Sequence, residues 1–205
     1  ILQIGKAGLI LDACDCSYET YQVTHSFSRN GMAPESSHSV ECSRLLERYE
    51  LAHSTGHLNI RRVEEICKVV SDIKNAGNEV IMVSSGAIGM GVGKLGLKER
   101  PKDIPTKQAA AAVEQCELIY VYDKLFSEYN HTVAQILLTA YDINHENCFE
   151  NFVNTMNKLL ELGVLPIVNE NDTVATNELG IGDNDTLAAI VASSINADLL
   201  ILMSD

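Results

Sequence analysis

From Leu58 onward the chain alternates between helical and strand-like patterns, and this alternation limits its possible folds more than any other feature. Apolar residues recur at helical spacing over 60–73, and Gly77 then ends the helix. The apolar run 79–84 follows as a buried strand. Similar patterns downstream predict helices at 105–126, 144–162 and 185–195 and strands at 132–138, 164–168 and 198–203. The succession predicts an α/β fold with a mostly parallel sheet and helices on both faces.

Three segments depart from this simple alternation. The strand at 164–168 contains Pro166, which predicts an edge position or a bulge because proline donates no ladder hydrogen bond. The stretch 173–181 is compatible with a hairpin. Residues 11–52 are rich in Ser, Cys, His, Glu and Tyr, and they predict an irregular insertion within one domain that covers residues 1–205.

The composition excludes several classes of partner. A formal net charge of −13 without a basic stripe argues against binding to nucleic acid or to an anionic membrane surface. No apolar run approaches the roughly 20 residues of a membrane span. The six cysteines lack a zinc-binding spacing and predict free thiols in a reducing cytoplasm, with Cys67 and Cys116 in the core.

A glycine-rich segment follows the strand at 79–84 and includes Ser85 and Gly86. Glycines between a strand and a helix let backbone N–H groups approach an anion, and the Ser85 hydroxyl is a donor for a substrate carboxylate. Close helix packing is the alternative explanation for these glycines, because the segment contains neither a P-loop lysine nor a dinucleotide-binding glycine pattern.

Two acidic loops follow further along the chain. Asn169–Thr173 ends a predicted strand, and its Asp172 carboxylate can accept the α-amino group of an amino acid; the alternative is an ordinary turn rich in Asn and Asp. Gly182–Thr186 precedes a helix, where Asp or Asn is commonly only an N-cap. In a parallel sheet, ligands bind beyond the carboxyl ends of the strands, so these loops and the glycine segment are expected to converge.

Four stretches resemble a known family. They are VSSGAIGMGVGKLGLKERPKDIPTKQAAAAVEQ, LFSEYNHTVAQILLT, LLELGVLPIVNENDTVA and GDNDTLAAIVASSINADLLILMSD. Together they make the chain similar to the glutamate 5-kinases, over about residues 53–205. The resemblance implies the αβα sandwich of the amino acid kinases. It also implies a cytoplasmic, homo-oligomeric enzyme that uses ATP and Mg²⁺ to phosphorylate the γ-carboxylate of L-glutamate, the first step toward proline.

The resemblance also assigns roles to individual residues. It places substrate glutamate against Ser85, Asp172 and Asn184, and the transferring phosphate near Asp185. Nucleotide contacts fall on Gly5, Gly86, Ser204 and Asp205. The family's opening strand carries a catalytic lysine. Here the corresponding stretch is residues 2–7, Gln3 occupies the place of the lysine, and Lys6 is the nearest candidate, on the loop.

Other departures leave alternatives open. Glu114 stands where the family has glycine, and the chain ends at Asp205, before the family's C-terminal nucleotide lobe. We therefore expect little activity from this chain alone. Gln3 favours a catalytically impaired amino-acid sensor as one alternative, and an acetylglutamate or aspartate kinase is another.

Overall fold

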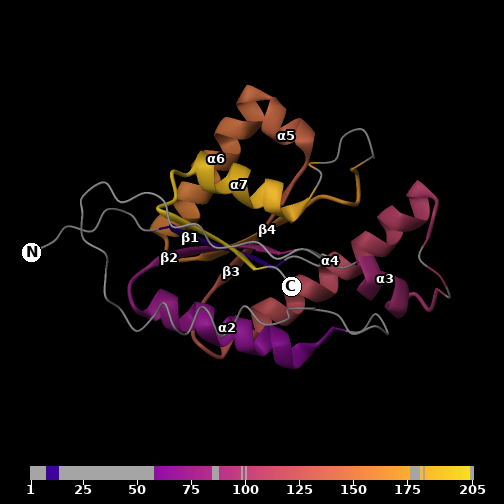
Figure 1. Ribbon diagram of the computed structural model, residues 1–205, viewed down its shortest axis with the longest axis horizontal. Helices are drawn as coiled ribbons and strands as arrows, with labels where there is room; N and C mark the ends of the chain where they lie inside the picture. The colour runs from indigo at the N-terminus through magenta and orange to yellow at the C-terminus, as the bar shows by residue number, and fades with distance from the viewer. Residues whose placement is uncertain are drawn as a thin grey trace, which may run out of the picture.

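A parallel β-sheet forms the centre of the molecule in the computed structural model, which describes residues 8–13, 58–84, 88–97, 99, 101–175, 181 and 183–203. The sheet order is β3-β4-β2-β1-β5, and every paired strand in the described part is parallel (Figure 1). The strands are β1 (Gly8–Ala13), β2 (Glu79–Ser84), β3 (Val133–Leu138), β4 (Leu165–Glu170) and β5 (Leu199–Met203). The predicted parallel sheet is thus confirmed.

Helices cover both faces of this sheet (Figure 1). They are α2 (Ile60–Asn75), α3 (Ile88–Lys94), α4 (Ile104–Ser127), α5 (Ala140–Asn144), α6 (Glu146–Glu161) and α7 (Asn184–Ser194). Helices α2 and α4 lie on one side, and α6 and α7 lie on the other. This arrangement is the αβα sandwich expected from the alternating sequence pattern.

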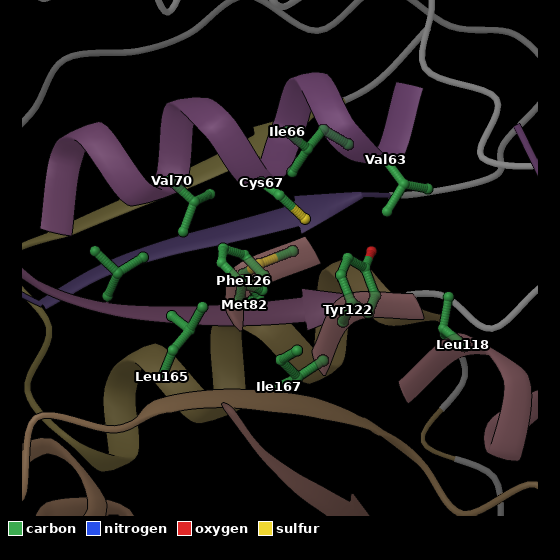
Figure 2. Packing of buried hydrophobic residues seen from close by; sticks show 11 residues of the cluster. Val63, Ile66, Cys67, Val70, Met82, Leu118, Tyr122, Phe126, Leu165 and Ile167 are labelled. Atoms are coloured by element: carbon green, nitrogen blue, oxygen red, sulfur yellow. The ribbon is translucent and has the colours of Figure 1, made fainter. Parts of the chain in front are cut away.

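The two hydrophobic cores follow from the alternation of side chains along β2. Val80 and Met82 face α2 and α4, whereas Ile81 and Val83 face α6 and α7, because successive strand side chains point to opposite faces. Figure 2 shows Met82 among residues of the first core. Because both faces of β2 are buried, its sequence is a continuous apolar run rather than an alternating one.

Capping residues define where several helices begin. Asp103 accepts a hydrogen bond from the Thr106 backbone N–H at 2.9 Å, and Pro105 occupies the first turn of α4. Thr139 and Asp142 form a reciprocal capping box at α5. His145 has an extended backbone, so the single helix predicted at 144–162 begins at Glu146 and is preceded by the separate helix α5.

The prediction for Pro166 is wrong, because β4 lies between β3 and β2. The Leu165 N–H donates to Thr132 on the β3 side at 2.9 Å. Because successive N–H groups along a strand point to opposite sides, the missing N–H of Pro166 faces β2. Pairing with β2 begins only at Met82↔Ile167, so the proline interrupts no ladder on that side.

Other predictions are changed or lie outside the described residues. Strand β1 includes residues 11–13, which the sequence assigned to the irregular insertion; 14–52 lie outside the described part, as do 176–180 of the predicted hairpin. Cys116 is exposed rather than in the core, whereas Cys67 is buried. Both are free thiols, as is Cys148. Among the described helices, none is long and apolar enough to cross a membrane.

Candidate functional site

The carboxyl ends of β2 and β4 bring two polar segments together. Val83 and Val168 are partners in the parallel ladder, so Ser84 and Asn169, the next residues, both reach the same edge of the sheet. Both line one small pocket, which has room for about one water molecule. Ser84 and Asn169 thus share one edge, whereas the predicted convergence of the glycine segment with both acidic loops stays a prediction, because Ser85 and Gly86 lie outside the described residues.

A buried hydrogen bond joins the end of β2 to helix α4. The Ser84 and Tyr122 hydroxyls lie 3.2 Å apart, and both residues are fully buried. Figure 2 shows Tyr122 among the core residues of α4. Burial raises the pKa of Tyr122, so its hydroxyl stays protonated and remains a hydrogen-bond donor. This pair fixes the backbone that leads directly into Ser85.

The amide of Asn169 is buried at the same edge. Its Oδ1 accepts a hydrogen bond from the Glu170 backbone N–H at 2.8 Å. Its Nδ2 is buried and has no hydrogen-bond partner among the described residues. A buried donor without a partner costs roughly 1–3 kcal/mol, so such a group at a strand end marks a place where a water or ligand would bind.

The loop after β4 is a hydrogen-bonded turn. The Asn171 N–H donates to the Leu138 carbonyl at 2.7 Å, and the Asn171 carbonyl accepts from Val174 and Ala175 at 3.1 and 3.0 Å. The Thr173 hydroxyl donates to Oδ1 of Asn171. Asn171 and Thr173 therefore have the structural role that an Asn- and Asp-rich turn predicts.

Asp172 differs from its neighbours in this turn. It is partly buried, and burial, with a smaller contribution from the charge of Glu170, raises the pKa of Asp172 to about 6. A carboxylate held in this partly desolvated position would gain from a cationic partner. Asp172 is therefore a binding-site candidate on physical grounds as well as from its sequence motif.

The beginning of α7 separates a capping residue from two candidate site residues. Asp183 accepts a hydrogen bond from the Thr186 N–H at 2.7 Å. Hydrogen bonding from the Thr186 side chain, together with this backbone hydrogen bond, lowers the pKa of Asp183. Because Asp183 caps the helix, Asn184 and Asp185 are not needed for that purpose. Both are partly buried in the first turn of α7, where the helix dipole stabilises a negative charge.

Glu170 joins the two acidic segments. Its Oε1 accepts a hydrogen bond from the backbone N–H of Ile181 at 2.8 Å, across eleven residues of sequence. The end of β4 and the approach to α7 therefore meet at one edge of the sheet. Glu170 belongs to the motif Asn169–Thr173, but the sequence alone assigned it no role. A contact between residues eleven positions apart leaves no periodic pattern in the sequence from which it could be predicted.

One glycine of the glycine-rich segment has a packing role. A Cβ at Gly91 would lie 2.1 Å from the Ala110 carbonyl oxygen, so α3 and α4 approach closely only because this residue lacks a side chain. The packing explanation therefore holds at Gly91. The candidate anion-binding residues Ser85 and Gly86 lie directly after β2, outside the described residues.

The remaining predicted site residues also lie outside the described part of the chain. Ser204 and Asp205 immediately follow β5. Gly5 and Lys6 come before β1 in the sequence, and β1 begins at Gly8. Gly8–Ala13 is the segment that pairs with β2 and β5, and the roles expected of Gly5 and Lys6 stay predictions.

The fold and this edge together define a class. The chain is a parallel α/β domain whose candidate ligand-binding groups lie at the carboxyl ends of its strands, as in other proteins with open parallel sheets. A sequence model of the amino acid kinase family matches residues 50–205. The chain therefore belongs to the amino acid kinase family.

Several curated relatives with similar sequences are glutamate 5-kinases. The chain is 51% identical over 159 residues to a glutamate 5-kinase of Clostridium perfringens, covering 76% of this chain and 59% of the relative. It is 55% identical over 155 residues to a glutamate 5-kinase of Clostridium acetobutylicum, covering 76% and 58%. A glutamate 5-kinase of Moorella thermoacetica is 52% identical, with 41% of its length covered. The chain thus spans about half the length of these relatives.

Proposed function

We propose that this chain carries the amino-acid site of a glutamate 5-kinase, which transfers the γ-phosphoryl group of ATP to the γ-carboxylate of L-glutamate. The products are γ-glutamyl phosphate and ADP. The observation that carries the proposal is the meeting of the β4 loop and the start of α7 at one edge of the sheet, through Glu170 and Ile181. The relatives named glutamate 5-kinase support the same reaction.

Each group at this edge has a chemical task in the proposed reaction. The Asp172 carboxylate accepts hydrogen bonds from the α-ammonium group of glutamate, and Ser85 and Asn184 form hydrogen bonds with the rest of the amino acid. Asp185 lies on the phosphate side. Lys6 is the proposed cation beside the transferring phosphate. The proposed nucleotide contacts are the positions that the family resemblance assigns, namely Gly5, Gly86, Ser204 and Asp205.

The reaction requires positioning more than proton transfer. The γ-carboxylate of glutamate is already ionised at neutral pH, so no general base is needed to activate it. Two negative groups must approach in line, and catalysis then depends on fixed donors and cations that neutralise the transferring phosphoryl group. Residues that hold glutamate at a fixed angle to ATP therefore contribute directly to the rate.

Mg²⁺ would supply charge neutralisation at the ATP phosphates. Magnesium is usually held by substrate phosphates, water and one or two carboxylates, and the Asp185 side chain at the start of α7 fits that limited need. No group of three His, Cys, Asp or Glu side chains that could hold a metal is present among the described residues.

The wider setting of the enzyme is proposed on the same resemblance. We place the reaction at the first step toward proline, in the cytoplasm, and in a homo-oligomer. ATP and L-glutamate are the proposed substrates.

The test uses the chemistry of the product. Residues 58–205 would be joined to the remaining C-terminal part of the Clostridium perfringens relative, with the opening segment also taken from that relative. Hydroxylamine converts an acyl phosphate into a stable hydroxamate, so we expect hydroxamate formation that depends on both ATP and glutamate. If this chimera and the relative are made in parallel and only the relative is active, the proposed function is wrong.

Competing substrates separate the alternatives. N-acetylglutamate has no α-ammonium group for Asp172, so we expect it neither to react nor to compete with glutamate. Aspartate is one methylene shorter and should place its carboxylate away from the phosphate. Calorimetric binding of glutamate without any hydroxamate would instead favour an amino-acid sensor.

A further inference from the structure

We propose that Glu170 is a positioning residue, which holds the start of α7 against the end of β4 and thereby sets the spacing between the two halves of the glutamate site. This inference rests on the proposed function, because it assigns Asp172 to one half of that site and Asn184 and Asp185 to the other. Glu170 itself need not touch the substrate.

The backbone beneath Glu170 is fixed from two sides. Glu170 is the last residue of β4 and is paired with Leu138 of β3. Its backbone N–H donates to Oδ1 of Asn169 at 2.8 Å, and Asn169 is 4% exposed. A side chain that leaves such a backbone has a defined origin and can act as a rigid support.

The contact that Glu170 makes is directed at the other half of the site. Its Oε1 lies 2.8 Å from the backbone nitrogen of Ile181. The Ile181 side chain packs against the core cluster that includes Val168 of β4 and Leu187 of α7. The segment entering α7 is thus held by one charge-assisted hydrogen bond and one apolar contact.

The hydrogen bond fixes residues that are close in sequence to the candidate site. Only Gly182 separates Ile181 from the cap Asp183, and Asn184 and Asp185 follow in the first turn of α7. A shift of the Ile181 backbone would therefore be transmitted to both side chains. Displacements of about 1 Å in positioning elements are enough to change rates up to about a hundredfold.

The charge of Glu170 has an unfavourable effect that helps to identify its purpose. The negative charge of Glu170 adds to the burial that raises the pKa of Asp172. A neutral side chain would make Asp172 easier to ionise, and ionised Asp172 is the form that binds an ammonium group. The advantage of a carboxylate at position 170 is that a charged oxygen accepts a stronger hydrogen bond from the Ile181 N–H than a neutral oxygen would.

Two substitutions separate the hydrogen bond from the charge. Glu170→Ala removes both, whereas Glu170→Gln keeps an oxygen that can accept from Ile181 and removes only the charge. Glu150→Gln, on the exposed side of α6, is the matched control for loss of one surface carboxylate. All three would be prepared in the chimera described above, and circular dichroism would verify that each is folded.

Amide hydrogen exchange reports the support directly. In Glu170→Ala we expect the Ile181 amide to exchange at least about tenfold faster than in the parent, whereas Glu170→Gln and Glu150→Gln should stay within about threefold. Unchanged exchange at Ile181 in Glu170→Ala would overturn the proposal. If the alanine variant fails to fold, Glu170→Gln serves as the test. Complete loss of protection from exchange at the Ile181 amide in that variant would also overturn the proposal, because the glutamine oxygen should still accept the hydrogen bond.

Kinetics distinguish positioning from a general structural effect. We expect Glu170→Ala to lower kcat/KM for glutamate by about tenfold to a hundredfold while the KM for ATP changes less than about threefold. Glu170→Gln should restore most of this loss and should move the acidic decline in glutamate affinity to lower pH. Faster exchange with unchanged kcat/KM in an active chimera would overturn the positioning role.

An inactive parent chimera has a different meaning. It would reject the proposed kinase reaction. Exchange at the Ile181 amide that becomes faster in Glu170→Ala and not in Glu170→Gln would still support the role of Glu170 in holding the start of α7 against β4. The two failures are therefore distinguishable.

Discussion

The two edges of the sheet are built in different ways. At the amino-terminal edge, each of the four described helix-to-strand connections is short and contains one residue with positive φ: Gly77, Asn130, Gly163 and Asn196, at 92°, 60°, 73° and 54°. Left-handed residues of this kind end helices by satisfying their last carbonyl groups. At the carboxyl-terminal edge the end of β4 and the loop after it instead carry the buried amide of Asn169 and the partly buried carboxylates of Glu170 and Asp172.

The difference shows how the chain separates stability from chemistry. Short turns connect the elements at the amino-terminal edge, and the polar side-chain atom buried in these turns without a partner among the described residues is the ring Nε2 of His131. The other edge holds a buried amide donor without a described partner and a carboxyl group whose pKa is raised to about 6. Both features cost folding free energy, and such costs concentrate at functional sites. Substitutions at the carboxyl-terminal edge should therefore affect function first, and those at the amino-terminal edge stability alone.

The largest effect is expected at Asp185. Asp185→Asn should lower kcat by about 100- to 1,000-fold, because it removes the carboxylate proposed to hold the Mg²⁺ that neutralises the phosphates. Its effect on the free energy of unfolding should stay below about 1 kcal/mol, the size of a helix-dipole interaction, since Asp183 provides the cap. Hydroxamate kinetics and chemical denaturation measure the two. A change in stability with normal kcat would show that the carboxyl-terminal edge is not the site.

The second effect is expected at Asp172. Asp172→Asn should raise the glutamate KM on the order of 100-fold, because an amide cannot replace the charge that faces the ammonium group. The same substitution should stabilise the chain at pH 7 by about 1 kcal/mol once solvent screening of this partly exposed group is allowed for, since it removes a carboxylate that is costly to ionise in the folded state. Urea unfolding measures this gain; a loss of stability would contradict the proposed electrostatics.

The pH dependence of this stability has a definite sign. The pKa of Asp172 is raised from 3.8 to about 6 in the folded protein, so the folded state holds the proton more tightly than the unfolded chain. The contribution of Asp172 to stability is therefore complete below about pH 4 and is lost as the pH rises through 6. The difference between the parent and Asp172→Asn should vanish near pH 4 and reach its maximum above pH 7. Glutamate affinity of the parent should weaken below about pH 6.

The third effect lies in the glycine-rich segment. Gly91→Ala places a Cβ 2.1 Å from the Ala110 carbonyl oxygen, so α3 must move away from α4. We expect the free energy of unfolding to fall by about 1–3 kcal/mol, as for other overpacked sites. Thermal unfolding and ATP kinetics would be compared. Loss of ATP affinity at unchanged stability would show that Gly91 contacts a phosphate rather than only allowing close packing.

Much of the fold could be predicted because the relevant signals are local. Helix α2 and strand β2 follow directly from spacing, and the actual bounds lie within about two residues of the prediction. The separate helix α5 was missed because Thr139 and Asp142 cap each other and His145 breaks the helix between α5 and α6. Pro166 was misplaced because the direction of its missing N–H depends on which strand lies beside it.

The site could be predicted only in part for a similar reason. Asp172, Asn184 and Asp185 stand out because they follow or precede regular elements. The supporting contacts join distant residues, namely Ser84 with Tyr122 and Glu170 with Ile181. Such pairings exist only after the sheet order is set, so periodicity and motif spacing carry no trace of them. That Asp183 is the cap, which leaves Asp185 for its proposed role in the site, could be seen only from hydrogen-bond geometry.

The smallest effect is expected at the amino-terminal edge and tests the comparison most directly. A Cβ at Gly163 would meet nothing within 4 Å, so Gly163→Ala introduces only the strain of a side chain at φ 73°. We expect a loss of about 1 kcal/mol in the free energy of unfolding, which lowers Tm by about 2–4 °C. Asn196→Gly is the opposite control, because it relieves a left-handed non-glycine residue at φ 54° and should change stability by less than about 0.5 kcal/mol. Neither variant should alter the glutamate KM by more than about twofold. A larger KM change at Gly163 would mean that the two edges are coupled through β4, and that stability and chemistry are not separated as their construction indicates.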